Sequence, residues 1–357
     1  MTERPRLLSV ATAVPPFALR QPDVQQRLRA IFRQCAGEAE RFLPVFDNAG
    51  VETRYSCVPL DWYENDHSWS DRNPLYLEHA TALLRQAAEG ALRSASLKAS
   101  QIDGIVCVST SGIATPSLDA LLLQRMAFRR DVFRLPIFGL GCAGGVIGLA
   151  RAARLALAAP EERILFLVVE PCALTFCRGD HSKSNIVATA LFGDGAAAAV
   201  VSCRGNGPRI VASGEHTWSD TLDVMGWDVG DDGLRVIFSR DIPSLIRTHF
   251  RPALDAFLER QGLTLAAIDD WLCHPGGAKV LDALEDALER NRGALGHARA
   301  VLRDFGNMSA ATVIFVLAHA LANGGLGRRA VLSALGPGFT AAFVLLETGG
   351  EGGRDAG

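Results

Sequence analysis

The sequence predicts an α/β protein built from two related halves, and two observations carry this prediction. Apolar runs with the length of buried strands alternate with amphipathic stretches of helical period, a pattern typical of sheets that are covered by helices. A set of short motifs also occurs twice in the same order, which indicates an internal duplication.

The expected elements follow from these local patterns. Apolar runs predict strands at residues 104–108, 164–169, 196–201, 270–273, 330–334 and 341–346. Periodic stretches predict helices at residues 76–94, 117–127, 143–158, 244–261, 278–290 and 309–323. The longest apolar stretch, 310–321, is shorter than the roughly 18 residues that cross a bilayer, so we expect a buried helix and no integral contact with a membrane.

The repeat pairs motifs across the chain. Ile102–Asp103 precedes one expected strand, and Ile268–Asp269 precedes another 166 residues later. GCAGG at Cys142 and GNMSA at Asn307 each open a helix of small residues, 165 residues apart. We therefore predict an N-terminal half at 1–203, a C-terminal half at 207–350 and a Gly-rich flexible tail at 351–357. Coincidence in an Ala-rich chain is the alternative interpretation.

Composition excludes several classes of protein. The 357 residues carry 36 basic and 39 acidic side chains, for a net charge of −3, so no basic field suited to nucleic acid is present. The N-terminus has no apolar core of a secretion signal. The eight cysteines are scattered singly without CxxC pairs, which indicates reduced thiols, a cytoplasmic location and no metal site.

Cys142 is the first candidate for chemistry. It stands in GLGCAGG, at the expected start of a helix, where unpaired backbone N–H groups and the helix dipole favour a thiolate. Flanking glycines leave room for a substrate carbonyl. A small buried cysteine in tight helix packing is the structural alternative.

His274 and Asn307 are the partner candidates. His274 follows an expected strand and precedes Pro-Gly-Gly, so it lies where α/β folds place ligand groups, and a neutral imidazole there could help to ionise a thiol or donate to an oxyanion. Asn307 could donate to a thioester carbonyl. A satisfied structural histidine and a helix N-cap remain the respective alternatives.

Five motifs together carry a family resemblance. GCAGG, HPGG and GNMSA, with LFGDGA and GPG in the same order, resemble the type III polyketide synthases, the relatives of chalcone synthase. The resemblance covers nearly the whole chain. It implies a thiolase-like αβαβα fold from two duplicated halves, a homodimer, and acyl-CoA and malonyl-CoA as substrates, with no metal, flavin or nicotinamide cofactor.

The resemblance also assigns roles residue by residue. Cys142 matches the nucleophile that holds the starter and the growing chain as a thioester. His274 matches the residue that activates this thiol and, with Asn307, binds the thioester carbonyl while malonyl-CoA loses carbon dioxide. A Claisen condensation then extends the chain on Cys142.

Further positions match the substrate cavity of the family. Phe192 matches a gatekeeping phenylalanine, and Val236 stands where a second one is expected. The remaining matches lie beside the cyclisation pocket, at the dimer interface, along the cavity and in its Gly-rich loops: Thr110, Ser111, Thr115, Cys172, Thr175, Ser309, Gly276, Gly277, Gly336, Pro337 and Gly338.

Departures from the plant pattern bear on the substrate. Ala143 and Val236 replace bulky aromatic residues, which removes side-chain volume. The stretches around EPCALTF and GVETRYSCVPLDWYEN resemble bacterial alkylresorcinol and alkylpyrone synthases. We therefore expect a medium- to long-chain fatty acyl starter, and the sequence does not choose between lactone and aldol closure. A ketoacyl synthase III-like enzyme with a single condensation, an aromatic or short starter, and an inactive thiolase-fold subunit are the alternatives.

Overall fold

One mixed nine-stranded sheet forms the centre of the molecule. The computed structural model describes residues 4–32, 44–239 and 241–349. Within them the strand order is β11 (Asp270–Cys273), β12 (Arg329–Gly336), β13 (Thr340–Glu347), β8 (Arg209–Thr217), β1 (Arg6–Ala13), β7 (Asp194–Ser202), β6 (Arg163–Pro171), β4 (Gly104–Val108) and β5 (Phe133–Ile137). All six strands expected from the sequence are present.

The sequence missed three strands of this sheet. β1 and β8 mix buried with half-buried or exposed positions, and β5 has only half-buried and exposed ones, so none of the three forms a continuous buried run. β5 also contains Pro136, which argues against a strand when only the sequence is read. Its place at the edge of the sheet makes the proline tolerable, because only one neighbour, β4, pairs with it.

The sheet repeats its pairing pattern on either side of the contact between β1 and β8. β4 runs parallel to β6, as β11 runs parallel to β12. β6 is antiparallel to β7, as β12 is to β13. β7 then pairs with β1, as β13 pairs with β8. The motif repeat of the sequence therefore corresponds to a repeat of strand pairing.

A matching pair of hydrogen bonds holds both halves. Asp103 donates its N–H to the Arg163 carbonyl over 2.9 Å and accepts the Arg163 N–H at Oδ2 over 2.8 Å. Asp269 makes the same two bonds with Arg329, also at 2.9 and 2.8 Å. The aspartates of the two Ile-Asp motifs thus have the same structural use.

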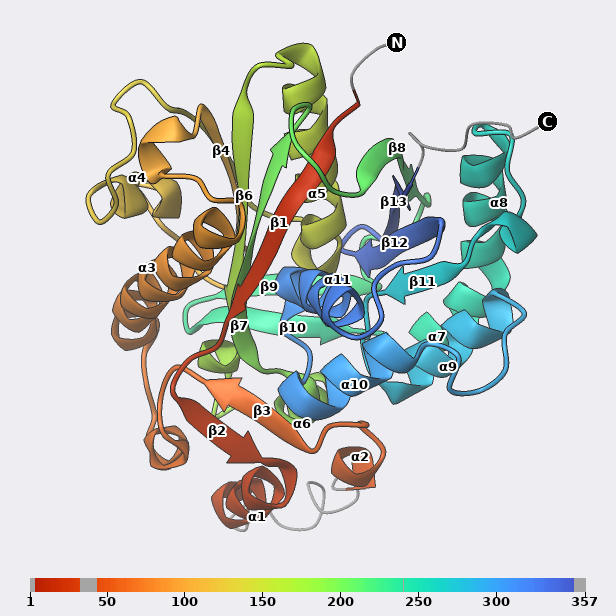
Figure 1. The fold of residues 1–357 in the computed structure, drawn as a ribbon. Helices are drawn as coiled ribbons and strands as arrows, with labels where there is room; N and C mark the ends of the chain where they lie inside the picture. The colour runs from red at the N-terminus through yellow and green to blue at the C-terminus, as the bar shows by residue number, and fades with distance from the viewer. Residues whose placement is uncertain (1–3, 33–43, 240, 350–357) are drawn as a thin grey trace, which may run out of the picture.

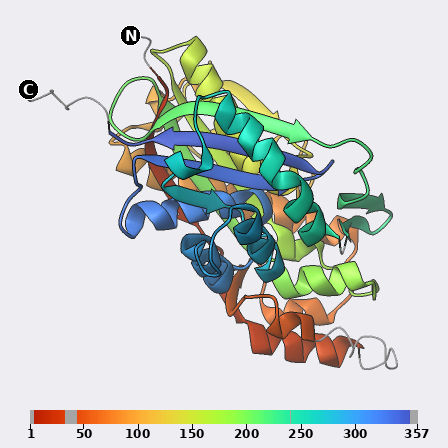
Figure 2. The same cartoon turned by 90° about the vertical axis from the view of Figure 1, so that its right-hand side faces the viewer.

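Helices complete an αβαβα arrangement. α5 (Gly144–Ala158) and α11 (Thr312–Ala322) are almost wholly buried and contact each other and strands of both halves. α3 (Trp69–Ser94) covers β1, β6 and β7 on one side, and α8 (Arg251–Glu259) packs on β13 on the other (Figures 1 and 2). The chain therefore has the thiolase-like layering that the resemblance implied.

Helix bounds differ from the expected ones at several ends. Short 3₁₀ turns at Gly141–Ala143 and Ser309–Ala311 open α5 and α11. α3 starts at Trp69 because Ser68 and Asp71 form a capping box. The remaining expected helices are observed as α4 (Leu118–Leu123), α7 (Ile242–Leu245) followed by a π-helical turn at Ile246–Phe250 and α8, and α9 (Ala278–Ala287).

A group of small elements lies below the sheet in the view of Figure 1. It was not expected from the sequence. The group comprises β2 (Phe17–Arg20), β3 (Thr53–Ser56), α1 (Gln21–Phe32), α2 (Pro44–Asp47), a 3₁₀ turn at Leu60–Glu64 and α6 (Lys183–Leu191). The hairpin of β9 (Met225–Gly230) and β10 (Gly233–Phe238) and helix α10 (Gly296–Phe305) were also missed.

The apolar stretch 310–321 is a buried core helix, as expected, since it belongs to α11. A different helical stretch, Gly141–Ala158, is the one within the described ranges that has the length and hydropathy of a membrane-crossing helix, and 67% of it is buried in the core. The tail predicted at 351–357 lies outside the described residues.

Candidate active site

Cys142 lies on a tight turn that begins with a glycine in the left-handed region. It occupies the 3₁₀ turn before α5, where Gly141 has a φ of +46° and donates its N–H to Thr110 Oγ1 over 3.2 Å. A Cβ on Gly336 would lie 2.5 Å from the Leu140 carbonyl oxygen, so the Gly-Pro-Gly loop of the second half packs against this turn. The two Gly-rich motifs are therefore in contact.

His274 is held by its backbone and leaves its ring unpaired. Its N–H donates to the Ser333 carbonyl over 2.8 Å, and its own carbonyl accepts from Gly276 over 3.2 Å. The side chain is 5% exposed, yet neither ring nitrogen has a hydrogen-bond partner. A buried polar group without a partner is rare, and at a candidate site it indicates a place for a ligand atom.

Asn307 joins the second half to the first. Its N–H donates to the Leu191 carbonyl over 2.8 Å and its carbonyl accepts from Gly193 over 3.0 Å, so that Asn307 and Phe192 form an isolated β-bridge. The side-chain Nδ2 reaches the Gly276 carbonyl at 3.4 Å, in the loop that follows His274. These bonds bring His274, Asn307 and the gatekeeper position together.

Ser309 completes the connection to the nucleophile. Its N–H donates to Asn307 Oδ1 over 2.8 Å, and its Oγ lies 3.7 Å from Cys142 Sγ. The two equivalent turns of the repeat therefore meet through Ser309. No hydrogen bond joins Cys142 to His274 among the described residues, since both ring nitrogens of His274 are unpaired.

Burial keeps both candidate groups neutral. Burial raises the pKa of the Cys142 thiol to about 12, against a smaller lowering by the hydrogen bond to Ser309, and the nearby Glu170 raises it further. Burial lowers the pKa of His274 to about 3. The helix N-terminus, which favours a thiolate, acts against this effect of burial on Cys142.

Glu170 is a further charged group beside the nucleophile, and the sequence analysis missed it. It is fully buried and accepts the N–H groups of Thr110 and Ser111, each at 3.0 Å, and the Ser111 hydroxyl at 2.6 Å. Burial raises its pKa to about 7, against lowering by these bonds. Thr110 and Ser111 therefore hold a carboxyl group rather than line the pocket described next. The sequence did contain a sign of this buried carboxyl group, because Glu170 is the one charged residue at the end of an apolar run.

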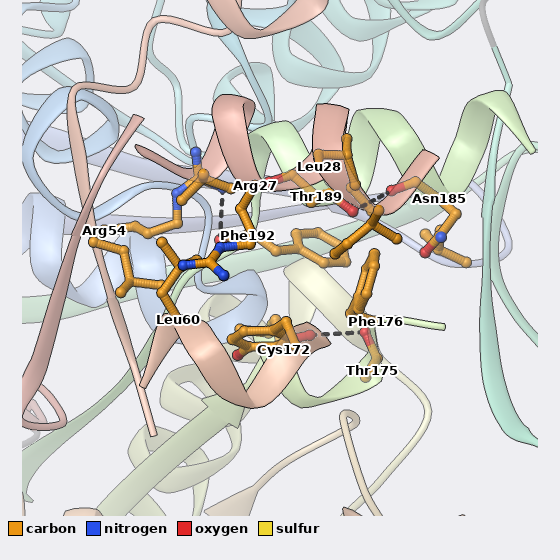
Figure 3. Close-up of a pocket in the computed structure, with 17 residues that line it drawn as sticks. Arg27, Leu28, Arg54, Leu60, Cys172, Thr175, Phe176, Asn185, Thr189 and Phe192 are labelled. Atoms are coloured by element: carbon orange, nitrogen blue, oxygen red, sulfur yellow. Dashed lines mark hydrogen bonds between the residues drawn. The ribbon is translucent and has the colours of Figure 1, made fainter. Parts of the chain in front are cut away.

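An apolar pocket lies beyond Phe192 (Figure 3). The volume open to the centre of a water molecule is about 60 Å³, and it is about 610 Å³ when all space between atoms, open solvent included, is counted. Four predicted cavity residues line it: Cys172, Thr175, Phe192 and Val236. The other walls come mainly from α1, the turn at Leu60–Glu64 and α6, and include Val24, Leu28, Ile31, Leu60, Phe176 and Ala188.

The pocket walls are fixed by buried polar groups. Asp194 accepts the N–H of Ala173 over 2.6 Å and the N–H of Cys57 over 2.8 Å, which anchors the turn that carries Cys172. Thr175 Oγ1 donates to the Cys172 carbonyl over 2.7 Å. Arg54 donates to three carbonyls at the end of α6, including that of Phe192 at 3.3 Å. Burial lowers the pKa of Arg54 to about 9.

The gatekeeper region contains more aromatic residues than expected. The Phe192 ring packs edge-on against Phe238 at 5.7 Å and against Trp227 at 6.2 Å, both from the β9–β10 hairpin. Val236 pairs with Trp227 in that hairpin. Phe192 is therefore supported by two aromatic rings of the same hairpin that carries Val236.

The remaining predicted residues fall into two groups. Gly276 and Gly277 form the turn between His274 and α9, and Pro337 and Gly338 follow Gly336 in the loop at the Cys142 turn. Thr115, in contrast, is exposed and is not joined to the site. The pocket lining does not include the three catalytic candidates, and the backbone contact of Phe192 with Asn307 links the two regions.

Comparisons with known proteins agree on one family. The model for the N-terminal domain of chalcone and stilbene synthases matches residues 3–205, and the model for their C-terminal domain matches residues 210–348. The 1,3,6,8-tetrahydroxynaphthalene synthase of Streptomyces peucetius subsp. caesius is 41% identical over 95% of this chain and 92% of that protein. The 3,5-dihydroxyphenylacetyl-CoA synthase of Amycolatopsis balhimycina is 30% identical over 97% and 94%.

A solved structure extends the agreement to three dimensions. The crystal structure of 1,3,6,8-tetrahydroxynaphthalene synthase from Streptomyces coelicolor A3(2), a bacterial type III polyketide synthase, has a TM-score of 0.92 and 30% identity. It covers 97% of this chain and is itself covered completely. These relatives support the family and not the alkylresorcinol and alkylpyrone branch. The chain belongs to the chalcone and stilbene synthase family and is an acyltransferase of the type III polyketide synthase class.

Proposed function

We propose that this polyketide synthase loads a medium- to long-chain fatty acyl group from its CoA thioester onto Cys142 and extends it with malonyl-CoA. The released products are alkylpyrones, alkylresorcinols or both. The observation that carries the proposal is the apolar pocket beyond Phe192, whose walls from α1 and α6 suit an alkyl chain.

Loading uses the two neutral groups of the resting site. His274, with both ring nitrogens unpaired, accepts the proton of Cys142 Sγ as the thiolate attacks the thioester carbonyl of the acyl-CoA. The C–S bond to CoA breaks, and the CoA thiolate takes the proton from His274. A new thioester then joins the acyl group to Cys142.

Extension uses Asn307 and the restored neutral His274. Malonyl-CoA loses carbon dioxide, and the electron pair of the broken C–C bond moves into an enolate whose charge lies on the thioester oxygen. Asn307 Nδ2 and a His274 N–H donate to this oxygen, and each such donor contributes about 3 to 4 kcal/mol in a water-poor site. The enolate carbon attacks the thioester on Cys142, and the longer chain passes to CoA before it returns to Cys142.

The proposed reaction draws on acyl-CoA and malonyl-CoA and on no metal or other cofactor. We also propose a cytoplasmic location, which the use of CoA thioesters supports. We also propose a homodimer, because Ile113 and Phe138, in the segments that follow β4 and β5, are 48% and 58% exposed. Large apolar side chains exposed at the surface favour a protein interface.

A second candidate is synthesis from malonyl-CoA alone. The 41% identity to a tetrahydroxynaphthalene synthase favours it. Such an enzyme would need no alkyl chain in the pocket, so the two candidates differ in their dependence on an added starter.

The deciding experiment is a product profile by mass spectrometry. Purified protein is incubated with malonyl-CoA alone and with acyl-CoAs from acetyl to stearoyl, plus one aromatic starter. Pyrones or resorcinols that form best with long chains would support the fatty acyl proposal. A product from malonyl-CoA alone that is unaffected by long-chain acyl-CoA would support the second candidate, and Cys142→Ala must abolish either product.

A further inference from the structure

Ser309 has an unusual backbone for its residue type. Its φ is +46°, in the left-handed region that few residues other than glycine adopt, and the residue is 7% exposed. Such backbones persist only where the surroundings impose them, and they gather at functional sites. Here Thr312 Oγ1 donates to the Ser309 carbonyl over 2.9 Å and accepts the Met308 N–H over 2.8 Å, which fixes the turn.

The turned backbone of Ser309 orients Asn307. It sends the Ser309 N–H to Asn307 Oδ1 at 2.8 Å. Because Oδ1 is occupied as an acceptor, the Asn307 amide group is held with Nδ2 as the donor, and Nδ2 has a second N–H besides the one that it directs to the Gly276 carbonyl. An amide in the opposite orientation would present an oxygen to the enolate oxygen and repel it.

The side chain of Ser309 is used differently. Its Oγ lies 3.7 Å from Cys142 Sγ and has no other hydrogen bond among the described residues. A hydroxyl group both accepts and donates, so it can accept from the neutral thiol and donate to the thiolate after the proton has left. His274 makes no such contact at rest, since its ring nitrogens are unpaired.

We propose that Ser309 is a positioning residue with two separable actions: its hydroxyl holds and stabilises the sulfur of Cys142, and its N–H fixes the amide of Asn307. The proposal rests on the proposed roles of Cys142 and Asn307. It explains why a left-handed serine stands at this point, since a glycine would satisfy the backbone and supply no hydroxyl.

The test measures the pH profile of Cys142 alkylation by iodoacetamide, followed by mass spectrometry of the Cys142 peptide. Ser309→Gly keeps the left-handed backbone and removes the hydroxyl together with Cβ, and Ser309→Ala removes the hydroxyl alone in a residue that, like serine, disfavours this backbone. Both should move the profile to higher pH, with alkylation about fivefold slower at a given pH, the factor that one net hydrogen bond contributes. If the smaller side chain only gave iodoacetamide better access to Cys142 Sγ, alkylation would become faster instead of slower.

Ser202→Ala is the matched control. The Ser202 hydroxyl is also buried and donates to the Glu162 carbonyl over 3.0 Å, at the end of β7 that lies away from Asp194. Its loss should leave the alkylation profile unchanged. Equal shifts of the alkylation profile in Ser309→Gly and Ser202→Ala would mean that loss of any buried hydroxyl has this effect, and would overturn the proposal.

Malonyl-CoA decarboxylation provides the second readout. Ser309→Gly retains the N–H bond to Asn307, so its decarboxylation rate should stay within about twofold of the parent while loading slows. An unchanged alkylation profile, or an equal loss of loading and decarboxylation, would overturn the proposal. Alkylation needs no polyketide product, so an enzyme that makes no product from any starter would refute the proposed function while the role of the Ser309 hydroxyl was still measured.

Discussion

The two halves of the molecule keep the same strand pairing but carry different chemistry on equivalent turns. The turn before α5 presents a thiol at Cys142, and the segment that leads into the turn before α11 presents an amide at Asn307. Asp103 and Asp269, in contrast, make the same backbone bonds at the same lengths in both halves. The backbone bonds of the two aspartates thus keep the same structure in both halves. The turns that meet at the centre differ in their side chains and hence in their chemistry.

The largest expected effect comes from removing the specialised group of the second half. Asn307→Ala deletes one donor to the enolate oxygen, so malonyl-CoA decarboxylation should fall by about 10²- to 10³-fold. Loading of an acyl-CoA onto Cys142 should change far less, because the thiol and His274 remain. Stopped assays of carbon dioxide release and of CoA release on loading measure the two steps separately. Equal losses in both would mean that the two turns do not divide the chemistry.

Close contact of the two helices at the centre gives the next effect. A Cβ on Gly145 in α5 would lie 2.2 Å from the Ala310 carbonyl oxygen at the start of the other central helix. Backbone cannot yield there as a flexible side chain would, so Gly145→Ala should lower the free energy of unfolding by about 3 kcal/mol. Urea denaturation measures this.

Gly296 offers a matched control for that substitution. It is the first residue of α10, and a Cβ there would meet no atom within 4 Å. Gly296→Ala should therefore leave the free energy of unfolding unchanged or raise it by about 0.5 kcal/mol. A loss as large in Gly296→Ala as in Gly145→Ala would contradict the argument from helix contact.

A smaller effect depends on pH and on His274. The folded protein binds a proton at His274 only near pH 3, whereas the unfolded chain binds one near its ordinary pKa of 6.5. Stability from the neutral imidazole is thus complete above pH 6.5 and is lost as pH falls from 6.5 toward 3, by up to about 1.4 kcal/mol per pH unit. His274→Asn should flatten this acid-side slope of the free energy of unfolding.

Urea titrations at pH 4.5, 5.5, 6.5 and 7.5 compare the parent with His274→Asn. Glu170 and Asp194 act with the opposite sign, since burial raises their pKa values to about 7 and about 6, and stability from them is lost as pH rises. Both carboxyl groups are present in parent and variant, so their contribution cancels in the difference. Parallel curves would show that His274 is not held neutral by the fold.

Sequence patterns predicted the parts of the molecule that local rules determine. Continuous apolar runs located β4 and β11 to the residue, and the repeat indicated that Cys142 and Asn307 occupy equivalent turns. The edge strand β5 and the half-exposed β8 escaped because packing, and not an apolar run, makes them strands. The strand conformation of β5 and β8 therefore depends on contacts with the rest of the fold.

The site shows the same division. Motifs identified the thiol, the imidazole and the amide. The pKa values of the thiol and the imidazole depend on burial, which no motif shows. Glu170 was missed because its partners at Thr110 and Ser111 lie about 60 residues away along the chain. The wall that α1 contributes to the pocket was missed for the same reason, since α1 and Cys172 meet only in the folded chain.

The smallest expected effect on stability comes from the aspartate bonds that the two halves share. Asp103 is 18% exposed at its side chain and also pairs with Arg129, whereas Asp269 is exposed. Asp103→Ala should therefore cost about 1.5 kcal/mol of unfolding free energy and Asp269→Ala about half of that, because water can replace a lost bond more easily at an exposed site. Asparagine at either position retains an acceptor for the arginine N–H and should recover most of the loss. A larger loss in Asp269→Ala than in Asp103→Ala would contradict the argument that burial sets the strength of these bonds, and would mean that the second half relies more on its aspartate.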